Sequence, residues 1–169
     1  MEAELRLLID QLASFPSWLA DRARDIPVSQ AAWKPDGTQF SWVEQVCHVR
    51  DVEREGYYFR IARILEEEWP LFGDINGTKL AIERKYYAQS PALALQTYRT
   101  FRDTNVARLR QASPVEFERR GTFGGAEGFP LRQSVGWMAE HDADHRGQIE
   151  ALIEAGRQAG VFPARGDSN

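Results

Sequence analysis

The sequence is poor in the side chains that build disulfides and multi-cysteine sites. Its 169 residues contain one cysteine, Cys47, and only three histidines. A single cysteine excludes a disulfide within the chain and any metal site that uses several cysteines. On a helix, Cys47 would lie about 100° around the axis from its neighbour His48. We therefore expect Cys47 to be a packed thiol of the core rather than a metal ligand.

Long runs of one kind of residue are also missing. The net charge is −4, and no basic run is long enough to follow a phosphate backbone. No apolar run approaches the roughly 20 residues that a membrane-spanning helix needs. The N-terminal segment carries acidic residues and lacks the basic start and apolar core of a signal peptide. We therefore expect a cytoplasmic protein that binds neither nucleic acid nor a membrane.

The residues that are present are typical of one folded domain. Hydrophobic residues make up 43% of the chain and charged residues 27%, which are ordinary values for a globular protein. A chain of this length can bury a substantial core. We expect a single domain over residues 1–169.

Apolar residues recur at helical spacing in four long segments. The expected helices cover residues 3–25 (with Pro16 inside), 41–67, 92–112 and 131–159. Ser41 and Glu44 match a capping box, and Ser90-Pro91 is a good helix start. Four such helices with modest loops predict an all-α four-helix bundle.

Two connections between these helices are longer than the rest. The connection between the second and third helices, about residues 69–90, is long enough to cross the bundle and should contain a short helix near residues 78–87. Residues 113–130 are rich in glycine and are expected to be a loop that could hold a short hairpin. The glycine spacing does not match a phosphate-binding fingerprint.

The three histidines can be placed on one site. His141 and His145 are four residues apart, so on a helix they lie about 6 Å apart along the axis and on the same side. Two such imidazoles can bind one metal ion, and His48 from the second helix would complete a three-nitrogen face. One coordination position would stay open, as in catalytic rather than structural zinc sites. The spacing alone leaves hydrogen-bonded core histidines as an alternative.

Known metal motifs fit the sequence poorly. The H-E-x-x-H pattern of zincin proteases would require glutamate where this chain has Asp142. Di-iron bundles use Glu-x-x-His pairs, but the residues three positions before the histidines are Gln45, Met138 and Asp142. Neither class is therefore predicted.

The chain resembles the DinB/YfiT superfamily over almost its whole length. The resemblance rests on the segment WVEQVCHVRDVE at residues 42–53 and on HDADHRGQI at residues 141–149. It implies a four-helix bundle with a divalent metal held by His48, His141 and His145, and water in the remaining positions. Zn²⁺ or Ni²⁺ is the ion expected first, with Fe²⁺ or Mn²⁺ as alternatives. Members are often dimeric, so the resemblance also implies a homodimer.

Some members of this superfamily are thiol-dependent transferases or isomerases that use mycothiol, bacillithiol or glutathione. The resemblance therefore implies a metal-dependent enzyme that activates a low-molecular-weight thiol for transfer to a small electrophile. The chemistry of the site equally allows a hydrolase with metal-bound hydroxide. A non-catalytic metal-binding or stress-response module and a plain structural bundle are further alternatives. No residue is assigned as a general acid or base.

Several polar residues near the histidines are candidates to orient the imidazole rings. They are Glu44, Asp51, Asp144 and Gln148. Glu44 is interpreted first as a capping residue. Asp51 and Glu53 are interpreted first as part of a solvated helix face, and Arg146 is expected to point away from the metal.

Overall fold

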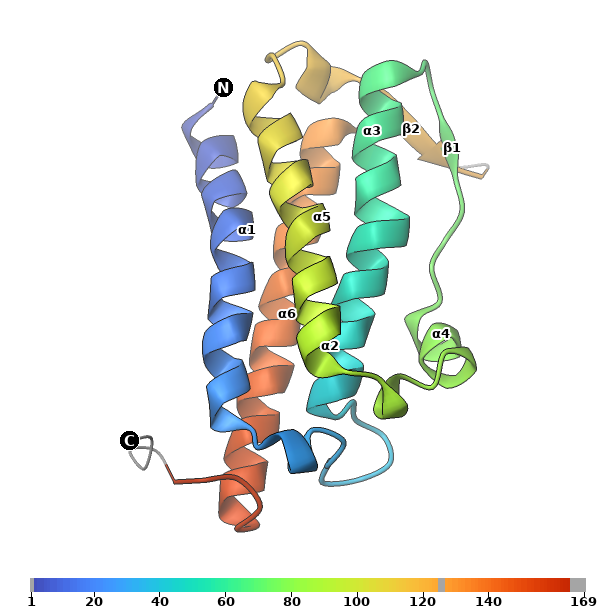
Figure 1. Cartoon of the computed structure of the whole chain (residues 1–169). Helices are drawn as coiled ribbons and strands as arrows, with labels where there is room; N and C mark the ends of the chain where they lie inside the picture. The colour runs from blue at the N-terminus through green and yellow to red at the C-terminus, as the bar shows by residue number, and fades with distance from the viewer. Residues whose placement is uncertain (1, 125–126, 165–169) are drawn as a thin grey trace.

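Four long helical rods lie side by side in the computed structural model, which describes residues 2–124 and 127–164 (Figure 1). In chain order the rods are α1 (Ala3–Arg22), then α2 (Trp42–Asp51) continued by the π-helical turn η3 (Val52–Tyr57) and α3 (Tyr58–Glu66), then α5 (Pro91–Gln111), and finally α6 (Leu131–Gln158). The all-α four-helix bundle expected from the apolar spacing is confirmed.

Shorter elements connect the rods. They are the 3-10 turns η1 (Ala23–Asp25), η2 (Val28–Gln30), η4 (Tyr86–Ala88) and η5 (Glu116–Glu118), the helix α4 (Gly77–Glu83), and the strands β1 (Leu71–Phe72), β2 (Arg120–Phe123) and β3 (Phe129–Pro130). The hairpin that the glycine-rich loop could hold is present as β2 and β3, which pair antiparallel. Strand β1 adds to β2 in parallel, and the sequence pattern did not indicate it.

The second and third rods run in the same direction, and α1 and α6 run the opposite way (Figure 1). Between two parallel rods the chain has to return along the outside of the bundle. Residues 70–90, which we call the crossover segment, make this return and bring α4 against α2. The expected crossover is therefore present.

Local sequence signals set the ends of the rods. The backbone N–H of Ser41 donates to Glu44 Oε2 at 2.8 Å, and the backbone N–H of Glu44 donates to Ser41 Oγ at 3.4 Å, which completes the capping box. Ser90 Oγ accepts the backbone N–H of Leu93 at the start of α5. Gly160 follows α6 with a φ of 70°, a conformation that glycine adopts without strain.

The second rod departs from the expected continuous α-helix. Its middle, Val52–Tyr57, is π-helical, which adds one residue to the turn. Single π-helical turns are often found at functional sites. This turn begins four residues after His48.

The apolar core is divided into two clusters by a layer of polar side chains. One cluster contains Phe15, Leu19, Val46, Tyr98 and Ile149, and the other contains Ile9, Leu12, Ile64, Leu109 and Met138. On each rod that contributes, polar residues lie at or beside the boundary between the clusters. We call this layer the polar belt, and its members are His48, Asp51, Glu53, Arg102, Asn105, His141, Asp142 and His145.

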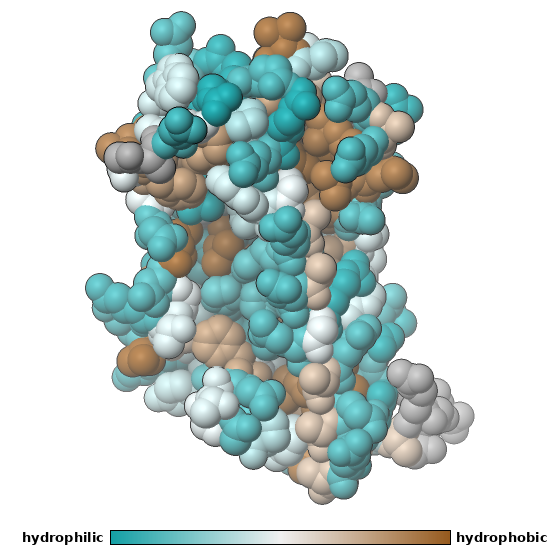
Figure 2. Space-filling model, turned by 180° about the vertical axis from the view of Figure 1, so that it is seen from behind, coloured by the Kyte–Doolittle hydropathy of each residue, from teal (hydrophilic) through white to brown (hydrophobic). Residues whose placement is uncertain are grey.

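The outer surface is mostly hydrophilic. Viewed from behind, hydrophobic residues form separate patches among hydrophilic ones (Figure 2). Among the described helices, none combines the length and the apolar character that crossing a bilayer would require.

Candidate metal centre

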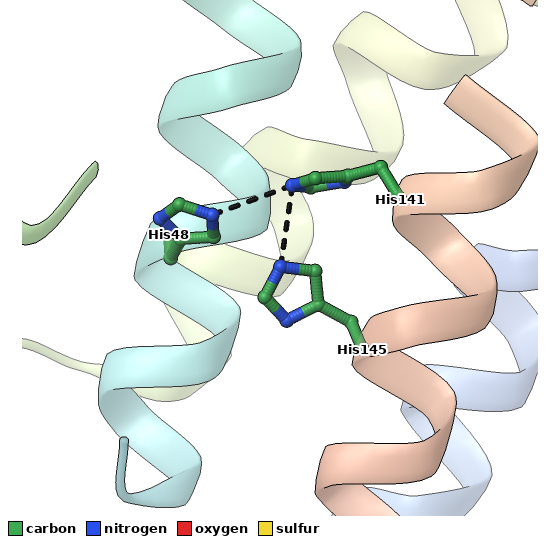
Figure 3. A group of neighbouring side chains, drawn as sticks. All are labelled: His48, His141 and His145. Carbon is green, nitrogen blue, oxygen red and sulfur yellow. Dashed lines mark hydrogen bonds between the residues drawn. The ribbon is translucent and has the colours of Figure 1, made fainter. Parts of the chain in front are cut away.

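The three histidines of the chain meet in the polar belt. His48 projects from α2, and His141 and His145 project from α6, so that the rings point toward one another (Figure 3). His141 Nε2 lies 3.3 Å from His48 Nε2 and 3.2 Å from His145 Nε2. The expected convergence of the three imidazoles therefore occurs.

The helical spacing explains this arrangement. His141 and His145 are one turn apart on α6, and their ring centroids are 4.4 Å apart. The capping box at Ser41 fixes where α2 begins, which places His48 in its second turn, facing α6. The ring centroid of His48 is 4.8 Å from that of His145.

A glutamine fixes the tautomer of His145. Gln45 Nε2 donates to Gln148 Oε1 at 3.0 Å, so Gln45 Oε1 is the atom that faces His145 Nδ1, at 2.5 Å. Because an amide oxygen only accepts, His145 Nδ1 must carry the proton, and the lone pair of His145 Nε2 points toward the other imidazoles. This is how a metal-binding histidine is usually oriented.

All three imidazoles are held in the neutral form. Burial and, to a smaller extent, the neighbouring His48 together lower the pKa of His145 to about 3. Burial also lowers the pKa of His141 well below its ordinary value, with additional effects from His145, His48 and Arg102. For His48, burial lowers the pKa and Asp51 partly opposes this. Neutral imidazoles keep the lone pairs that a metal ion needs.

The hydrogen-bonding capacity of the three rings is incomplete without a further group. One proton on His141 Nε2 could satisfy either His48 Nε2 or His145 Nε2, but not both. His48 Nδ1 is buried and has no hydrogen-bond partner among the described residues. Buried polar atoms without partners are rare in native proteins and often mark an ion or a ligand.

The spacing of the nitrogens also fits a metal ion. Two nitrogens bound at about 2.0–2.1 Å to a tetrahedral ion are roughly 3.3–3.4 Å apart. The two nitrogen separations measured here are 3.2 and 3.3 Å, and all three ligand atoms lie within 4.8 Å of one another. The three-histidine cluster can therefore hold one divalent ion and leave a coordination position for another ligand.

A second cluster of the polar belt lies next to the histidines and was not predicted. Arg102 Nη1 and Nη2 donate to both oxygens of Asp142, at 2.5 and 3.0 Å, and Nη2 also donates to Glu53 Oε2 at 2.9 Å. Asn105 Nδ2 donates to Glu53 Oε1 at 2.6 Å. Glu53 is 1% exposed, so its interpretation as a solvated residue is wrong.

The interpretation of Asp51 as a solvated residue is also wrong, since its side chain is fully buried. It accepts hydrogen bonds from Arg50 Nε at 2.7 Å, Arg84 Nη1 at 2.6 Å and Tyr86 Oη at 2.7 Å. These partners tie the second rod to the crossover segment. The carboxylate does not contact the imidazoles, so it is a structural anchor rather than a ring-orienting group.

The other candidates are distributed as follows. Glu44 caps α2, as expected, and pairs with Lys34 at 2.9 Å. Asp144 is exposed on α6, while Gln148 acts on His145 through Gln45. The guanidinium of Arg146 lies over the ring of Trp18 at 4.6 Å, which agrees with the expectation that it points away.

Cys47 is a core thiol, as the sequence predicted. It is fully buried in the cluster that contains Phe15 and Val46. Burial raises the pKa of Cys47 to about 11, with smaller contributions from nearby charged groups, so the thiol stays protonated at neutral pH. It is therefore unsuited to act as a nucleophile or a metal ligand.

Sequence reasoning missed Gln45 as the residue that orients His145. It is 2% exposed and lies one helical turn before His48 on the same face of α2. A buried glutamine three residues from a ligand was the available signal, because residues at that spacing are neighbours on a helix.

A cleft of about 730 Å³ adjoins the histidine cluster. Its walls come from the loop that precedes α2 and from α4, and its lining includes Phe40, Gln45, Thr78, Lys85 and Gln148. Gln45 and Gln148 therefore face the cleft on one side and connect to His145 on the other. A cleft of this size can hold a small molecule.

The fold and the histidine cluster together define a helical bundle with a candidate metal site. The family model of the DinB superfamily matches residues 11–149, and the chain therefore belongs to that superfamily. This confirms the resemblance seen in the two histidine-containing segments.

Among solved structures, the chain is similar to YfiT from Bacillus subtilis, described as a probable metal-dependent hydrolase with an unusual four-helix bundle topology. The TM-score is 0.81 at 20% sequence identity, and the match covers 95% of this chain and 90% of YfiT. At this identity the similarity establishes the fold. No curated protein sequence matches the chain.

Proposed function

We propose that this protein is an enzyme that uses one divalent metal ion, held by His48, His141 and His145, to activate a low-molecular-weight thiol for transfer to a small electrophile. The observation that carries the proposal is the convergence of three neutral imidazoles, with Nε2 atoms 3.2 and 3.3 Å apart. Zn²⁺ or Ni²⁺ is the expected ion, since both suit imidazole ligands.

Each residue of the site has a role in this proposal. A bound divalent ion would supply Lewis acidity, which lowers the pKa of a thiol or a water molecule. His145 is held in the correct tautomer by Gln45, and Gln148 holds Gln45 in turn. The two apolar clusters on either side of the polar belt limit access of water to the imidazoles. The adjoining cleft offers space for the thiol and the electrophile.

A metal-dependent hydrolase is the second candidate. It is favoured by the description of YfiT, whose fold this chain shares. The same three imidazoles would then hold a metal ion that supplies a hydroxide nucleophile, and the cleft would bind an ester or an amide. The homodimer and the cytoplasmic location stay predictions.

Metal titration tests the site before any reaction is assayed. Metal-free protein is titrated with Zn²⁺ and Ni²⁺, and the expected result is one ion per chain. His145→Ala should weaken binding at least about 100-fold, because loss of a ligand exceeds the 10–100-fold effect of losing a residue that only orients one. Asp144→Ala, an exposed neighbour on α6, is the matched control and should bind like the unmodified protein.

Activity assays then separate the two reactions. Loaded protein is given glutathione or cysteine with a chromogenic aryl chloride, and separately a panel of nitrophenyl esters. Conjugation that His145→Ala abolishes supports the transferase, and ester cleavage with the same dependence supports the hydrolase. Stoichiometric metal without conjugation by any thiol would reject the transferase, and failure to bind metal would reject the site itself.

A further inference from the structure

Gly77 of the crossover segment lies against His48 of the histidine cluster. A Cβ atom added at Gly77 would overlap Cε1 and Nδ1 of His48. The backbone at Gly77 thus lies directly against the Nδ1–Cε1 edge of the His48 ring. Figure 3 shows that Nδ1 is on the side of this ring away from His141. Only glycine allows an approach this close.

The crossover segment is fixed at both of its ends. At one end, β1 pairs with β2, and Arg63 Nη1 donates to the carbonyl oxygen of Leu71 at 2.9 Å. At the other end, Arg84 pairs with Glu55 through two hydrogen bonds of 2.7 and 2.9 Å, and also with the buried Asp51. Asp51 lies one helical turn after His48, so the anchor and the ligand share one helix.

Residues next to Gly77 hold the middle of the crossover segment against the second rod. A Cβ atom on Gly56, in the π-helical turn, would lie 2.9 Å from Ile75 Cδ1, so Ile75 packs against bare backbone there. Asn76 Oδ1 accepts the backbone N–H of Lys79 at 2.9 Å and fixes the first turn of α4, to which Gly77 belongs. The position of Gly77 is therefore set independently of His48.

His48 has no hydrogen bond of the kind that orients His145. Its Nδ1 is buried without a partner in the part of the chain that the structure describes, whereas His145 Nδ1 is bonded to Gln45. The ring of His48 is instead confined by packing, with Phe40 at 5.6 Å between ring centroids and the backbone of Gly77 on its Nδ1 edge. Packing thus orients the ring of His48, whereas the hydrogen bond to Gln45 fixes both the orientation and the tautomer of His145.

We propose that Gly77 is a positioning residue for His48, and that the crossover segment sets the metal affinity of the site through this contact. The inference rests on the proposed metal centre. It assigns the crossover segment a role in ligand geometry, in addition to connecting two parallel rods.

Gly77→Ala is the direct test, and Gly73→Ala is its matched control. Both glycines belong to the crossover segment, but a Cβ at Gly73 would meet nothing within 4 Å. Neither Gly73 nor Gly77 has a positive φ, so the backbone conformation allows alanine at both positions. Metal-free variants are titrated with Co²⁺, followed by its visible absorption bands, and Zn²⁺ affinity is obtained by competition.

We expect Gly77→Ala to weaken Co²⁺ and Zn²⁺ binding about 10–100-fold, the usual effect of disturbing a residue that orients a ligand. Gly73→Ala should stay within about twofold of the unmodified protein. Equal affinity for Gly77→Ala and Gly73→Ala would overturn the proposal. If the unmodified protein itself binds no metal, the proposed function fails instead.

A double-mutant cycle tests the contact without any metal. In the presence of a chelator, Gly77→Ala should lower the melting temperature by about 2–4 °C, the shift expected for a modest steric strain in a chain of this size. In a His48→Ala background the imidazole is gone, so adding Gly77→Ala should lower the melting temperature no further. An equal decrease in both backgrounds would show that the strain does not involve His48 and would overturn the proposal.

Discussion

The polar belt contains two clusters of polar side chains, which differ in charge and in how their polar atoms are paired. The histidine cluster (His48, His141 and His145) is neutral, its Nε2 atoms face one another, and His48 Nδ1 has no hydrogen-bond partner among the described residues. The ion cluster (Glu53, Arg102, Asn105 and Asp142) is charged, and both carboxylates have all their oxygens bonded. Both lie in the same layer between the same apolar clusters, but His48 and His141 are only partly buried, whereas all four residues of the ion cluster are buried.

The adjacent residues His141 and Asp142 belong to different clusters. Successive residues on a helix point about 100° apart, so His141 faces the second rod and Asp142 faces Arg102 on α5. The comparison shows that buried charge alone does not mark a reactive site. Unpartnered atoms do not mark it either, because Arg102 Nε and Asn105 Oδ1 of the ion cluster also lack a hydrogen-bond partner among the described residues. The histidine cluster can accept an external ion because its three Nε2 atoms converge, and one shared proton cannot satisfy them all.

Arg102→Ala should give the largest effect on stability. The side chain is 1% exposed, and its loss leaves two buried carboxylates without a cation. Breaking a buried ion pair from one side costs about 3–5 kcal/mol of unfolding free energy. Denaturant unfolding in the presence of a chelator measures this cost without a contribution from metal binding.

Arg99→Ala is the control for this experiment. Arg99 lies one helical turn earlier on α5 and pairs with Asp103 at 3.7 Å, with both side chains more than half exposed. Such a surface pair contributes at most about 1 kcal/mol. If the two variants were equally stable, the ion cluster would have no structural role and the distinction between the clusters would be lost.

The sequence predicted the histidine cluster better than the ion cluster, for a physical reason. The spacing of His141 and His145 is local, and helical geometry alone places both rings on one face. The burial of Asp51 and Glu53 depends on Arg84 and Arg102, which are 33 and 49 residues away in the chain. No local pattern indicates whether an acidic residue will meet such a partner.

Parts of the fold escaped prediction for related reasons. The π-helical turn adds one residue to a helix, and an apolar pattern with a period of 3.6 does not reveal it. Strand β1 has two residues, too few for alternation to be recognised. By contrast, the four rods and the capping box at Ser41 were predictable, because each depends on residues close together in the sequence.

Gln45→Ala should produce an intermediate effect that is confined to the histidine cluster. Without Gln45 Oε1, nothing fixes the proton on His145 Nδ1, and metal affinity should fall about 10–100-fold. This corresponds to about 1.4–2.7 kcal/mol of binding free energy. Isothermal titration with Zn²⁺ measures it.

Gln133→Ala, at an exposed position on α6, is the control for Gln45→Ala and should leave the affinity unchanged. Arg102→Ala sharpens the comparison further. Its folded fraction should bind Zn²⁺ more tightly than Gln45→Ala does, although it is the less stable variant. The reverse order would mean that the ion cluster, rather than Gln45, orients the ligands.

Pro16→Ala should produce the smallest effect, and it tests how the ion cluster is completed. Proline has no backbone N–H, so the carbonyl oxygen of Leu12, four residues earlier on α1, loses its helical hydrogen bond. Arg102 Nη1 donates to that carbonyl oxygen at 3.2 Å. The proline inside α1 thus frees an acceptor for the buried arginine.

Replacing a proline in a helix interior usually stabilises a helix by about 3 kcal/mol. Here the new N–H of alanine would compete with Arg102 for one carbonyl, and the well-packed, buried ring of Pro16 would be lost. We therefore expect a change in unfolding free energy below about 1 kcal/mol. A gain near the full helix-propensity value would show that Arg102 does not depend on the freed carbonyl. A small change, together with unaltered Zn²⁺ affinity, would show that Pro16 supports the ion cluster and not the proposed metal site.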